Sequence, residues 1–422
     1  MSGRASLQEH FLKNPYKVHA LLFVIFIVQG FFYNTPEEIA RGLWAIIMSP
    51  DILVTDYVYV GGLGAAFVNV GLAGLVSVIA LAAAKHVPTG LTMGALGLVI
   101  GFAFFGKNPA NMLPIILGGF LYSKFAKVPA KDCILIPVLA TSLAPAVTQL
   151  THVGYFPFGV CVALGILVGL FIGFIMNPFA VSVRKVHEGY NLYNVGFASG
   201  ILGLGLFALY RLIGINHPLS SVWSSGYNTE LALFLAITSG YFILCGILSH
   251  GGRLSIKELI KPKEEGNDFY KVFAEKAYIG MGIMGLACLA VMFIVRGEYS
   301  GPVLGSILSV VGFGAFGKAL ASAAPIFGGA MLASAATMLI TGAAFNSPGF
   351  LVAAFFSSCL SPFGRRFGVF WGFIAGFLHL SLATQIAIFH GGLNLYNNGF
   401  AGGLVAMILL PIVYFFRKET PA

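Results

Sequence analysis

Residues 187–200 read HEGYNLYNVGFASG, and residues 390–403 read HGGLNLYNNGFAGG. We call these stretches copy 1 and copy 2. Ten of their fourteen positions are identical at a constant offset of 203 residues. A repeat whose period is half the chain indicates two related halves. The repeats of a solenoid are much shorter and recur about every 20 to 50 residues.

A second pair of related stretches supports this duplication. Residues 101–115 read GFAFFGKNPANMLPI and residues 312–326 read GFGAFGKALASAAPI, with eight of fifteen positions identical at an offset of 211. Both pairs occur in the same order within each half. Internal duplication therefore explains the matches better than coincidence does.

The composition is that of a membrane protein. Of 422 residues, 58% are hydrophobic and 9% are charged, against about 25% charged in a typical soluble domain. The apolar residues gather in runs of about 17 to 28 residues, the length at which a helix crosses a bilayer. The sequence therefore predicts an all-α integral membrane protein, and a soluble protein with buried helices is the alternative. No small-residue cleavage site follows residues 18–32, so we expect a retained first span rather than a signal peptide.

The basic residues predict the topology. If the N-terminus is cytoplasmic and every apolar run crosses once, 20 of the 24 Lys and Arg residues fall on the cytoplasmic side, as the positive-inside rule predicts. The run at 229–249 is then an extra crossing that inverts the second half. We expect two inverted-topology repeats of about six transmembrane or re-entrant segments each, plus an extra N-terminal span and a connecting span. The expected location is the cell inner membrane, multi-pass, with both termini cytoplasmic.

The predicted organisation has four parts. Residues 1–56 hold the cytoplasmic N-terminus, the first span and an interfacial segment, and residues 57–214 are repeat 1. Residues 215–275 hold a polar loop, the connecting span and a cytoplasmic linker. Residues 276–422 are repeat 2 and the C-terminal tail.

Two asparagines in each copy are the first candidates for a solute site. Asn is a poor helix former, and an unsatisfied amide in hydrocarbon is costly. Asn191 with Asn194, and Asn394 with Asn397, therefore indicate a broken backbone that faces water or a solute. Uncharged amides suit a neutral polar solute or an anion more than a bare cation. The alternative is that these side chains cap helix starts and hydrogen-bond to the other half.

Repeated histidines and lysines are the next candidates. His187 and His390 are either interfacial residues or members of a proton relay, although Glu188, a possible relay partner, has no counterpart in copy 2. Lys107 and Lys318 each lie between two apolar runs, seven residues before a proline. Each is either a snorkelling loop lysine or a cation that attracts an anion near a re-entrant helix end. The predicted solute-binding residues are Asn191, Asn194, Asn394, Asn397, Tyr193, Tyr396, Lys107, Lys318, His187 and His390.

The acidic residues and the enzyme motifs are informative by their absence. All fifteen Asp and Glu residues lie in tails, loops or the edges of apolar runs, with Asp51 and Asp56 among the closest to a run. Proton- and sodium-coupled carriers usually place a carboxylate deeper, so we expect facilitative passage. No HExxH, GxSxG or GxxxxGK(S/T) motif occurs. We therefore expect no enzyme activity, no catalytic residue, no metal site and no cofactor.

These observations predict a membrane transporter or channel for a small polar solute, neutral or anionic, with a central pathway between the inverted repeats. The expected partners are that solute or anion and the lipid bilayer, without nucleic acid, and homo-oligomers are usual for such folds. The alternative is a polytopic membrane enzyme or sensory scaffold whose halves build a lipid-facing cavity, with His379 or His390 beside a nucleophile.

Each copy opens the last apolar run of its half with a Tyr-Asn pair bracketed by glycines. The residues are Gly189, Tyr193, Asn194, Gly196 and Gly200 in copy 1, and Gly392, Tyr396, Asn397, Gly399 and Gly403 in copy 2. These segments resemble the urea transporter family, whose halves each close with a GxYGxNxxLxGL-like segment. The resemblance covers these segments and the inverted architecture, and the LPF-type pore stretches of that family are not visible here. The whole chain also resembles a family of prokaryotic polytopic membrane proteins, which implies no function.

Overall fold

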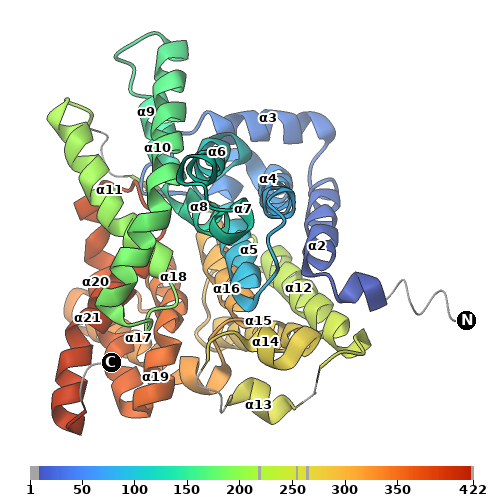
Figure 1. Ribbon diagram of the computed structural model, residues 1–422, viewed down its shortest axis with the longest axis vertical. Coiled ribbons are helices and arrows are strands. Elements are labelled where there is room, and N and C mark those ends of the chain that lie inside the picture. The colour runs from blue at the N-terminus through green and yellow to red at the C-terminus, as the bar shows by residue number, and fades with distance from the viewer. Residues whose placement is uncertain (1–8, 217–219, 253–254, 263–265, 420–422) are drawn as a thin grey trace, which may run out of the picture.

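The structure is a computed structural model that describes residues 9–216, 220–252, 255–262 and 266–419. Both termini are predicted to be cytoplasmic, and their residues 1–8 and 420–422 lie outside the described residues. The described residues are mostly helical (Figure 1). They include one short parallel strand pair, β1 (Val54–Thr55) with β2 (Ser221–Val222).

Within the described residues, eight helical segments are long and apolar enough to cross a bilayer, as in an all-α, multi-pass membrane protein. Their helices are α4 (Tyr57–Ala83), α10 (Phe158–Arg184), α11 (Asn194–Leu212), α12 (Asn228–Leu248), α15 (Ala277–Ile294), α17 (Leu320–Thr341), α20 (Val369–Ile386) and α21 (Asn397–Arg417). Short turns extend three of them: η2 (Lys185–His187) follows α10, η5 (Ala387–His390) follows α20, and α14 (Phe269–Phe273) with η3 (Ala274–Lys276) precedes α15.

The other predicted runs form short or interrupted helices. Helices α5 (Gly90–Phe102) and α16 (Gly301–Phe313) have 13 residues each, which is about 20 Å against a hydrocarbon core of about 30 Å. Two further runs are broken by a 3₁₀ turn, as α8 (Leu135–Ala140), η1 (Thr141–Leu143) and α9 (Ala144–Thr151), and as α18 (Pro348–Ser357), η4 (Ser358–Leu360) and α19 (Ser361–Phe367). The remaining helices are α2 (Pro15–Gly30), α3 (Pro36–Ile47), α6 (Pro109–Ala126), α7 (Ala130–Cys133) and α13 (Ile256–Ile260). Such helices fit the re-entrant part of the prediction, because α5 and α16 are each shorter than the hydrocarbon core is thick.

The segment predicted to lie in the membrane interface forms α3, which runs across one end of the molecule (Figure 1). Thr35 and Glu38 form a capping box at its start, and this arrangement satisfies free N–H groups of the first turn. Ile39 and Ile46 are buried against the bundle, whereas Trp44 is exposed. This amphipathic pattern agrees with an interfacial helix, in which an exposed tryptophan is common.

Helices α5 and α16 lie against each other in the middle of the molecule (Figure 1). Their contacts run in antiparallel order, from Gly90 against Ala315 to Gly101 against Gly305. Gly97 lies against Gly312, and one turn further along α5, Gly101 lies against Gly305. A Cβ atom at Gly97 would lie 2.7 Å from the Cα atom of Gly312, and one at Gly101 would overlap the carbonyl oxygen of Gly305. The two helices can approach this closely because these positions carry no side chain.

Each half fixes the start of the other half's central helix through a carboxylate. Asp56 Oδ2 accepts the backbone N–H of Gly301, the first residue of α16, at 3.0 Å. Asp268 Oδ1 accepts the backbone N–H of Gly90, the first residue of α5, at 2.9 Å. Asp56 Oδ2 also accepts the backbone N–H of Ser224 at 2.9 Å, next to β2. A carboxylate is favourable at a helix start because the first N–H groups are free and the helix dipole is positive there.

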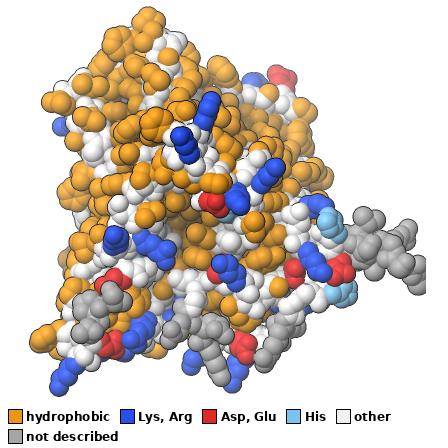
Figure 2. All heavy atoms as spheres, viewed as in Figure 1, with side chains coloured by type: hydrophobic (Ala, Val, Ile, Leu, Met, Phe, Trp, Pro, Cys, Tyr) orange, Lys and Arg blue, Asp and Glu red, His pale blue; other side chains and the backbone are white. Residues whose placement is uncertain are grey.

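The face of the molecule in Figure 2 is mostly hydrophobic, and the charged side chains on it gather toward its lower half. Large apolar side chains on the spanning helices are exposed, among them Leu167, Leu233, Leu339 and Phe415. A soluble protein rarely exposes so continuous an apolar surface. This surface is therefore suited to contact with the lipid chains of a bilayer.

Candidate functional site

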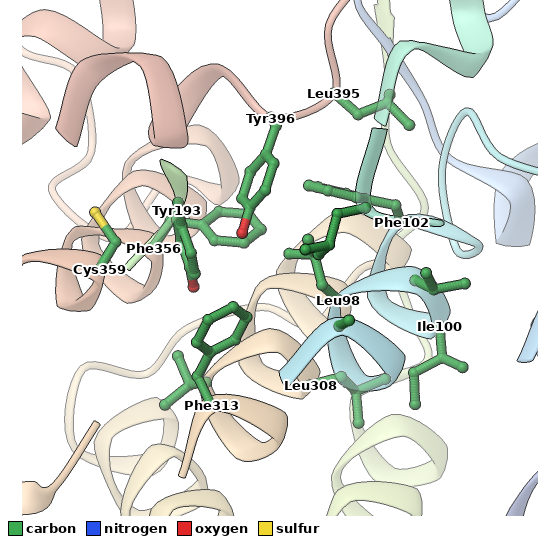
Figure 3. Packing of buried hydrophobic residues seen from close by; sticks show 14 of the residues in the cluster. Leu98, Ile100, Phe102, Tyr193, Leu308, Phe313, Phe356, Cys359, Leu395 and Tyr396 are labelled. Carbon is green, nitrogen blue, oxygen red and sulfur yellow. The ribbon is translucent and has the colours of Figure 1, made fainter. Parts of the chain in front are cut away.

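The two copies meet at a pair of tyrosines. The ring centroids of Tyr193 and Tyr396 lie 4.7 Å apart. Both side chains extend from the loops before α11 and α21 toward α5 and α16 (Figure 3). Beside them Gly196 lies against Gly399, which lets α11 and α21 approach. The stretch that recurs in the sequence therefore forms part of the contact between the halves.

The chain is irregular before each of these final helices. Residues 188–189 have φ values of 50° and 81°, and residues 391–392 have 55° and 73°, a region that glycine adopts readily. Asn191 and Asn394 then each accept the backbone N–H two residues ahead at 3.0 Å. Such an Asx turn replaces helical hydrogen bonding with a local one. The backbone is thus broken where the Asn and Gly content predicts a break.

The leucine of each copy joins the loop to the opposite half. Leu192 donates its N–H to the carbonyl oxygen of Cys359, and Leu395 donates to that of Ser142, both at 2.9 Å. The two acceptors lie in η4 and η1, where the helices are interrupted and carbonyl groups become free. Each leucine side chain also packs on the Gly-Lys turn of the opposite half. The contacts are reciprocal, as expected of two halves related by a two-fold axis.

Both asparagine side chains of copy 1 are paired, whereas His187 Nδ1 is buried without a partner among the described residues. Asn191 Nδ2 donates to the carbonyl oxygen of Gly399 in the other half at 2.9 Å. Asn194 Oδ1 pairs with His187 Nε2 at 2.9 Å, and Asn194 Nδ2 donates to the carbonyl oxygen of Ala180 at 2.9 Å. The prediction that these amides bond to the other half therefore holds for Asn191.

The equivalent atoms of copy 2 are buried and poorly paired. Asn394 Nδ2 has no partner among the described residues, and His390 and Asn397, which face each other as His187 and Asn194 do, make no hydrogen bond of good geometry with each other. The Tyr396 hydroxyl group is also buried without a hydrogen-bond partner among the described residues. Buried polar groups are normally satisfied, and each exception calls for a strain, a water or a ligand. The two copies therefore share a sequence but not an environment.

Both repeated lysines lie in the interior. Lys107 is 0% exposed and Lys318 is 1% exposed, so neither snorkels to the surface. Lys107 Nζ lies 5.1 Å from the ring centroid of Phe102, and Lys318 Nζ lies 5.3 Å from that of Phe313. Among the residues that the structure describes, no carboxylate oxygen lies within 4.0 Å of either ammonium group. A cation–π contact is only a partial substitute for a counter-charge.

The two lysines differ in their hydrogen bonds. Lys318 Nζ donates to the hydroxyl oxygen of Tyr193, which also pairs with Ser309 Oγ at 2.9 Å. Lys107 Nζ has no hydrogen-bond partner among the described residues. Because both lysines are central, they contribute nothing to the charge of either membrane face, on which the predicted topology partly relied.

A cavity of about 250 Å³ reaches the tyrosine pair. We call it the copy-1 cavity. Five predicted solute-binding residues line it: His187, Asn191, Tyr193, Asn194 and Tyr396. The other five do not: Lys107, Lys318, His390, Asn394 and Asn397. Its described lining includes the exposed Arg184 and no acidic residue. Asn267 also lines it and accepts a hydrogen bond from Arg365 Nη2 at 2.5 Å.

A buried carboxyl group escaped the sequence reasoning. Asp51 lies in the loop between α3 and α4, outside the candidate spans, yet it is 1% exposed. The Tyr57 hydroxyl donates to its Oδ1 at 2.8 Å, and Asn111 Nδ2 donates to its Oδ2 at 3.1 Å. Burial raises the pKa of the Asp51 carboxyl to about 7. Asn111 and Thr148 line a neighbouring cavity of about 340 Å³.

No nucleophile accompanies the histidines that the enzyme alternative invoked. His379 Nε2 pairs with the carbonyl oxygen of Asn398 at 3.0 Å, and within the described ranges no hydroxyl or thiol pairs with His379 or His390. The same ranges contain no group of three or more His, Cys, Asp or Glu side chains that could hold a metal ion.

Residues 35–212 and 255–415 match the protein family described as "Protein of unknown function (DUF1576)". These two regions span most of the chain, and the protein therefore belongs to that family. No curated protein matches the chain, and no solved structure matches it. The resemblance to urea transporters thus stays a prediction from the sequence.

Proposed function

We propose that the protein is a membrane transporter or channel that moves a small polar solute, neutral or anionic, between two inverted repeats. The observation that carries this proposal is the copy-1 cavity, which has three amides among mostly apolar lining side chains and reaches Tyr193 and Tyr396 where the copies meet. Solute sites of repeat-built transporters lie at such junctions, near broken helices. Irregular backbone at membrane depth is tolerated where it lines a cavity.

The antiparallel crossing of α5 and α16 supports the inverted arrangement. These helices are equivalent elements, because residues 101–115 and 312–326 correspond at a constant offset. A two-fold axis that relates antiparallel helices is perpendicular to both of them. If α5 and α16 run across the bilayer, that axis lies in the membrane plane, which is the geometry of inverted repeats.

The lining supports an uncharged or negatively charged solute. Asn191 and Asn194 contribute amide groups to the lining. Each amide already makes hydrogen bonds within the protein, but its nitrogen has a second N–H and its oxygen a second lone pair for a solute. Arg184 is the charged residue among the described lining residues. A cation entering this cavity would meet a positive charge without a compensating carboxylate, which opposes its entry.

The inverted topology is tested by cysteine labelling at equivalent positions. His187 and His390 are buried and unsuitable, but Lys185 and Ile388 are exposed and differ by the same offset of 203. We expect a membrane-impermeant maleimide to label Ile388→Cys in intact spheroplasts and Lys185→Cys only in opened membranes. The five native cysteines are buried and should give little background. Labelling of both positions from the same side would rule out inverted repeats.

The pathway is tested by flux into vesicles that contain the purified protein. Urea, acetamide, formate and nitrate are the probes, and we expect at least one to enter faster than into protein-free vesicles. Val181 lines the copy-1 cavity and is 63% exposed. Attaching a bulky maleimide to Val181→Cys should slow that flux severalfold, because the adduct fills the cavity.

Leu167→Cys is the matched control. Leu167 lies on the same helix, α10, is 60% exposed and does not line the cavity. Its modification should leave the flux unchanged. Equal slowing of both variants, or of neither, would contradict a pathway through the copy-1 cavity.

A further inference from the structure

The centre of the molecule contains one satisfied and one unsatisfied lysine–tyrosine pair. The duplication makes Lys107 with Tyr396 the equivalent of Lys318 with Tyr193. Lys318 donates to the Tyr193 hydroxyl. Lys107 Nζ and the Tyr396 hydroxyl are both buried and without a partner among the described residues. The same interaction is therefore present on one side of the axis and absent on the other.

A sequence difference between the halves accompanies this asymmetry. Ser309 pairs with the Tyr193 hydroxyl at 2.9 Å, and the position equivalent to Ser309 in α5 is Leu98. Leu98 lies near Tyr396 in Figure 3 and offers no polar atom. The Tyr396 hydroxyl therefore lacks the protein partner that Tyr193 has, and its donor remains available.

The two unpaired groups lie around one aromatic ring. Lys107 Nζ is 5.1 Å from the centroid of Phe102, and the Tyr396 ring centroid is 5.2 Å from the same point. Leu395, next to Tyr396, packs against Gly106, next to Lys107. Tyr396 also lines the copy-1 cavity, so that cavity ends beside the side chain that carries one of the two buried donors.

Both groups can donate hydrogen bonds, and Lys107 is a cation when its amine is protonated. A buried charge without a counter-charge is costly, and no carboxylate lies within 4.0 Å of Lys107 among the described residues. An anion would offset that cost by accepting from both groups. A cation would be repelled, and a neutral solute would leave the charge uncompensated.

We propose that Lys107 Nζ and the Tyr396 hydroxyl bind a small monovalent anion at the end of the copy-1 cavity. This inference rests on the proposed function and names its solute class. The equivalent Lys318 site takes no anion, because its ammonium group is already bound to Tyr193. One anion therefore binds per chain.

Equilibrium binding to purified protein in detergent tests the site. Nitrate, chloride and formate are the probes, added at constant ionic strength against gluconate, which is a much bulkier anion than the three probes. A bound anion stabilises the folded protein by mass action, so the thermal midpoint should rise with probe concentration. We expect Lys107→Met to abolish this response and Tyr396→Phe to weaken the apparent affinity about tenfold, as loss of one charge-assisted contact does.

Two matched controls separate this effect from general changes in the interior. Lys276 is also buried, but its ammonium group donates to the carbonyl oxygens of Gly246 at 3.0 Å and Ser249 at 2.7 Å. Tyr278 is buried with an unpaired hydroxyl group far from the copies in sequence. Lys276→Met and Tyr278→Phe should therefore keep the anion response of the unmodified protein.

The outcomes distinguish the site from the transport function. A missing response in the unmodified protein, or a full response in Tyr396→Phe and Lys107→Met, would overturn the anion site. Tyr396→Phe removes one oxygen atom, so it remains informative even if Lys107→Met does not fold. Anion binding without any vesicle flux would keep the site and refute transport. Flux of a neutral solute without anion binding would refute the site and keep transport.

Discussion

Replacing Gly101 with valine will leave little or no folded protein. A Cβ atom at this position overlaps the carbonyl oxygen of Gly305, and the reciprocal overlap occurs at Gly305. The obstacle is backbone and cannot rotate away, so α5 and α16 must separate along their whole contact. Overpacking of a core costs about 1–3 kcal/mol and more where nothing can yield, and total stabilities are only about 5–15 kcal/mol.

The measurement is the elution profile and thermal midpoint of the detergent-extracted protein. Gly305→Val should fail in the same way, because the contact is reciprocal. Gly240→Val on α12 is the control, since a Cβ atom there meets nothing within 4 Å. If Gly101→Val eluted and melted like Gly240→Val, the close crossing of the central helices would be wrong.

The duplicated stretches predicted the centre of the fold well. Copies 1 and 2 recur over fourteen positions, and Tyr193 and Tyr396, which occupy the same place in them, come within 4.7 Å. The asparagines marked the breaks before α11 and α21 because an Asx turn needs that side chain at that place. Composition therefore predicted the all-α membrane class, and the duplication predicted the junction of the halves.

The burial of charged residues could not be predicted in this way. Lys107 and Lys318 lie between apolar runs, where a charge normally marks a loop in water, but here the turns fold into the interior. The carboxylates Asp56 and Asp268 were missed for a related reason. Asp56 and Asp268 are 212 residues apart in the sequence, and each accepts a hydrogen bond from the first residue of a helix in the other half. A lone long-range contact leaves no pattern along the chain.

The asymmetry between the halves was also invisible in the repeated stretches. It depends on Ser309 and Leu98, which lie outside the stretches that recur most clearly. Aligning the two halves at the offset of 211 places Ser309 opposite Leu98. The consequence of that difference becomes clear only in the structure, where Ser309 contacts the Tyr193 hydroxyl. Identity between the copies thus located the junction of the halves, whereas the difference between Ser309 and Leu98 accounts for the unpaired hydroxyl of Tyr396.

Raising the pH from about 4 to 7 will destabilise the protein through Asp51. Burial raises the pKa of its carboxyl from 3.8 to about 7, so the folded state holds a proton that the unfolded state releases. The contribution of Asp51 to stability is fully present below the unfolded pKa, declines as the pH rises, and is lost above the folded pKa. At about 1.36 kcal/mol per pKa unit, the difference amounts to at most about 4 kcal/mol.

Asp51→Asn isolates this contribution, because the amide stays neutral at every pH. The thermal midpoints of both proteins are compared between pH 4.5 and 8, and the histidines, which are common to both, cancel in the difference. The midpoint of the unmodified protein should fall relative to that of Asp51→Asn as the pH rises, and the difference should level off above pH 7. The Tyr57 hydroxyl and the Asn111 amide face the carboxyl group and favour its charged form. If these two hydrogen bonds outweighed burial, the difference would have the opposite slope, and Asp51 would be a buried carboxylate rather than a buried acid.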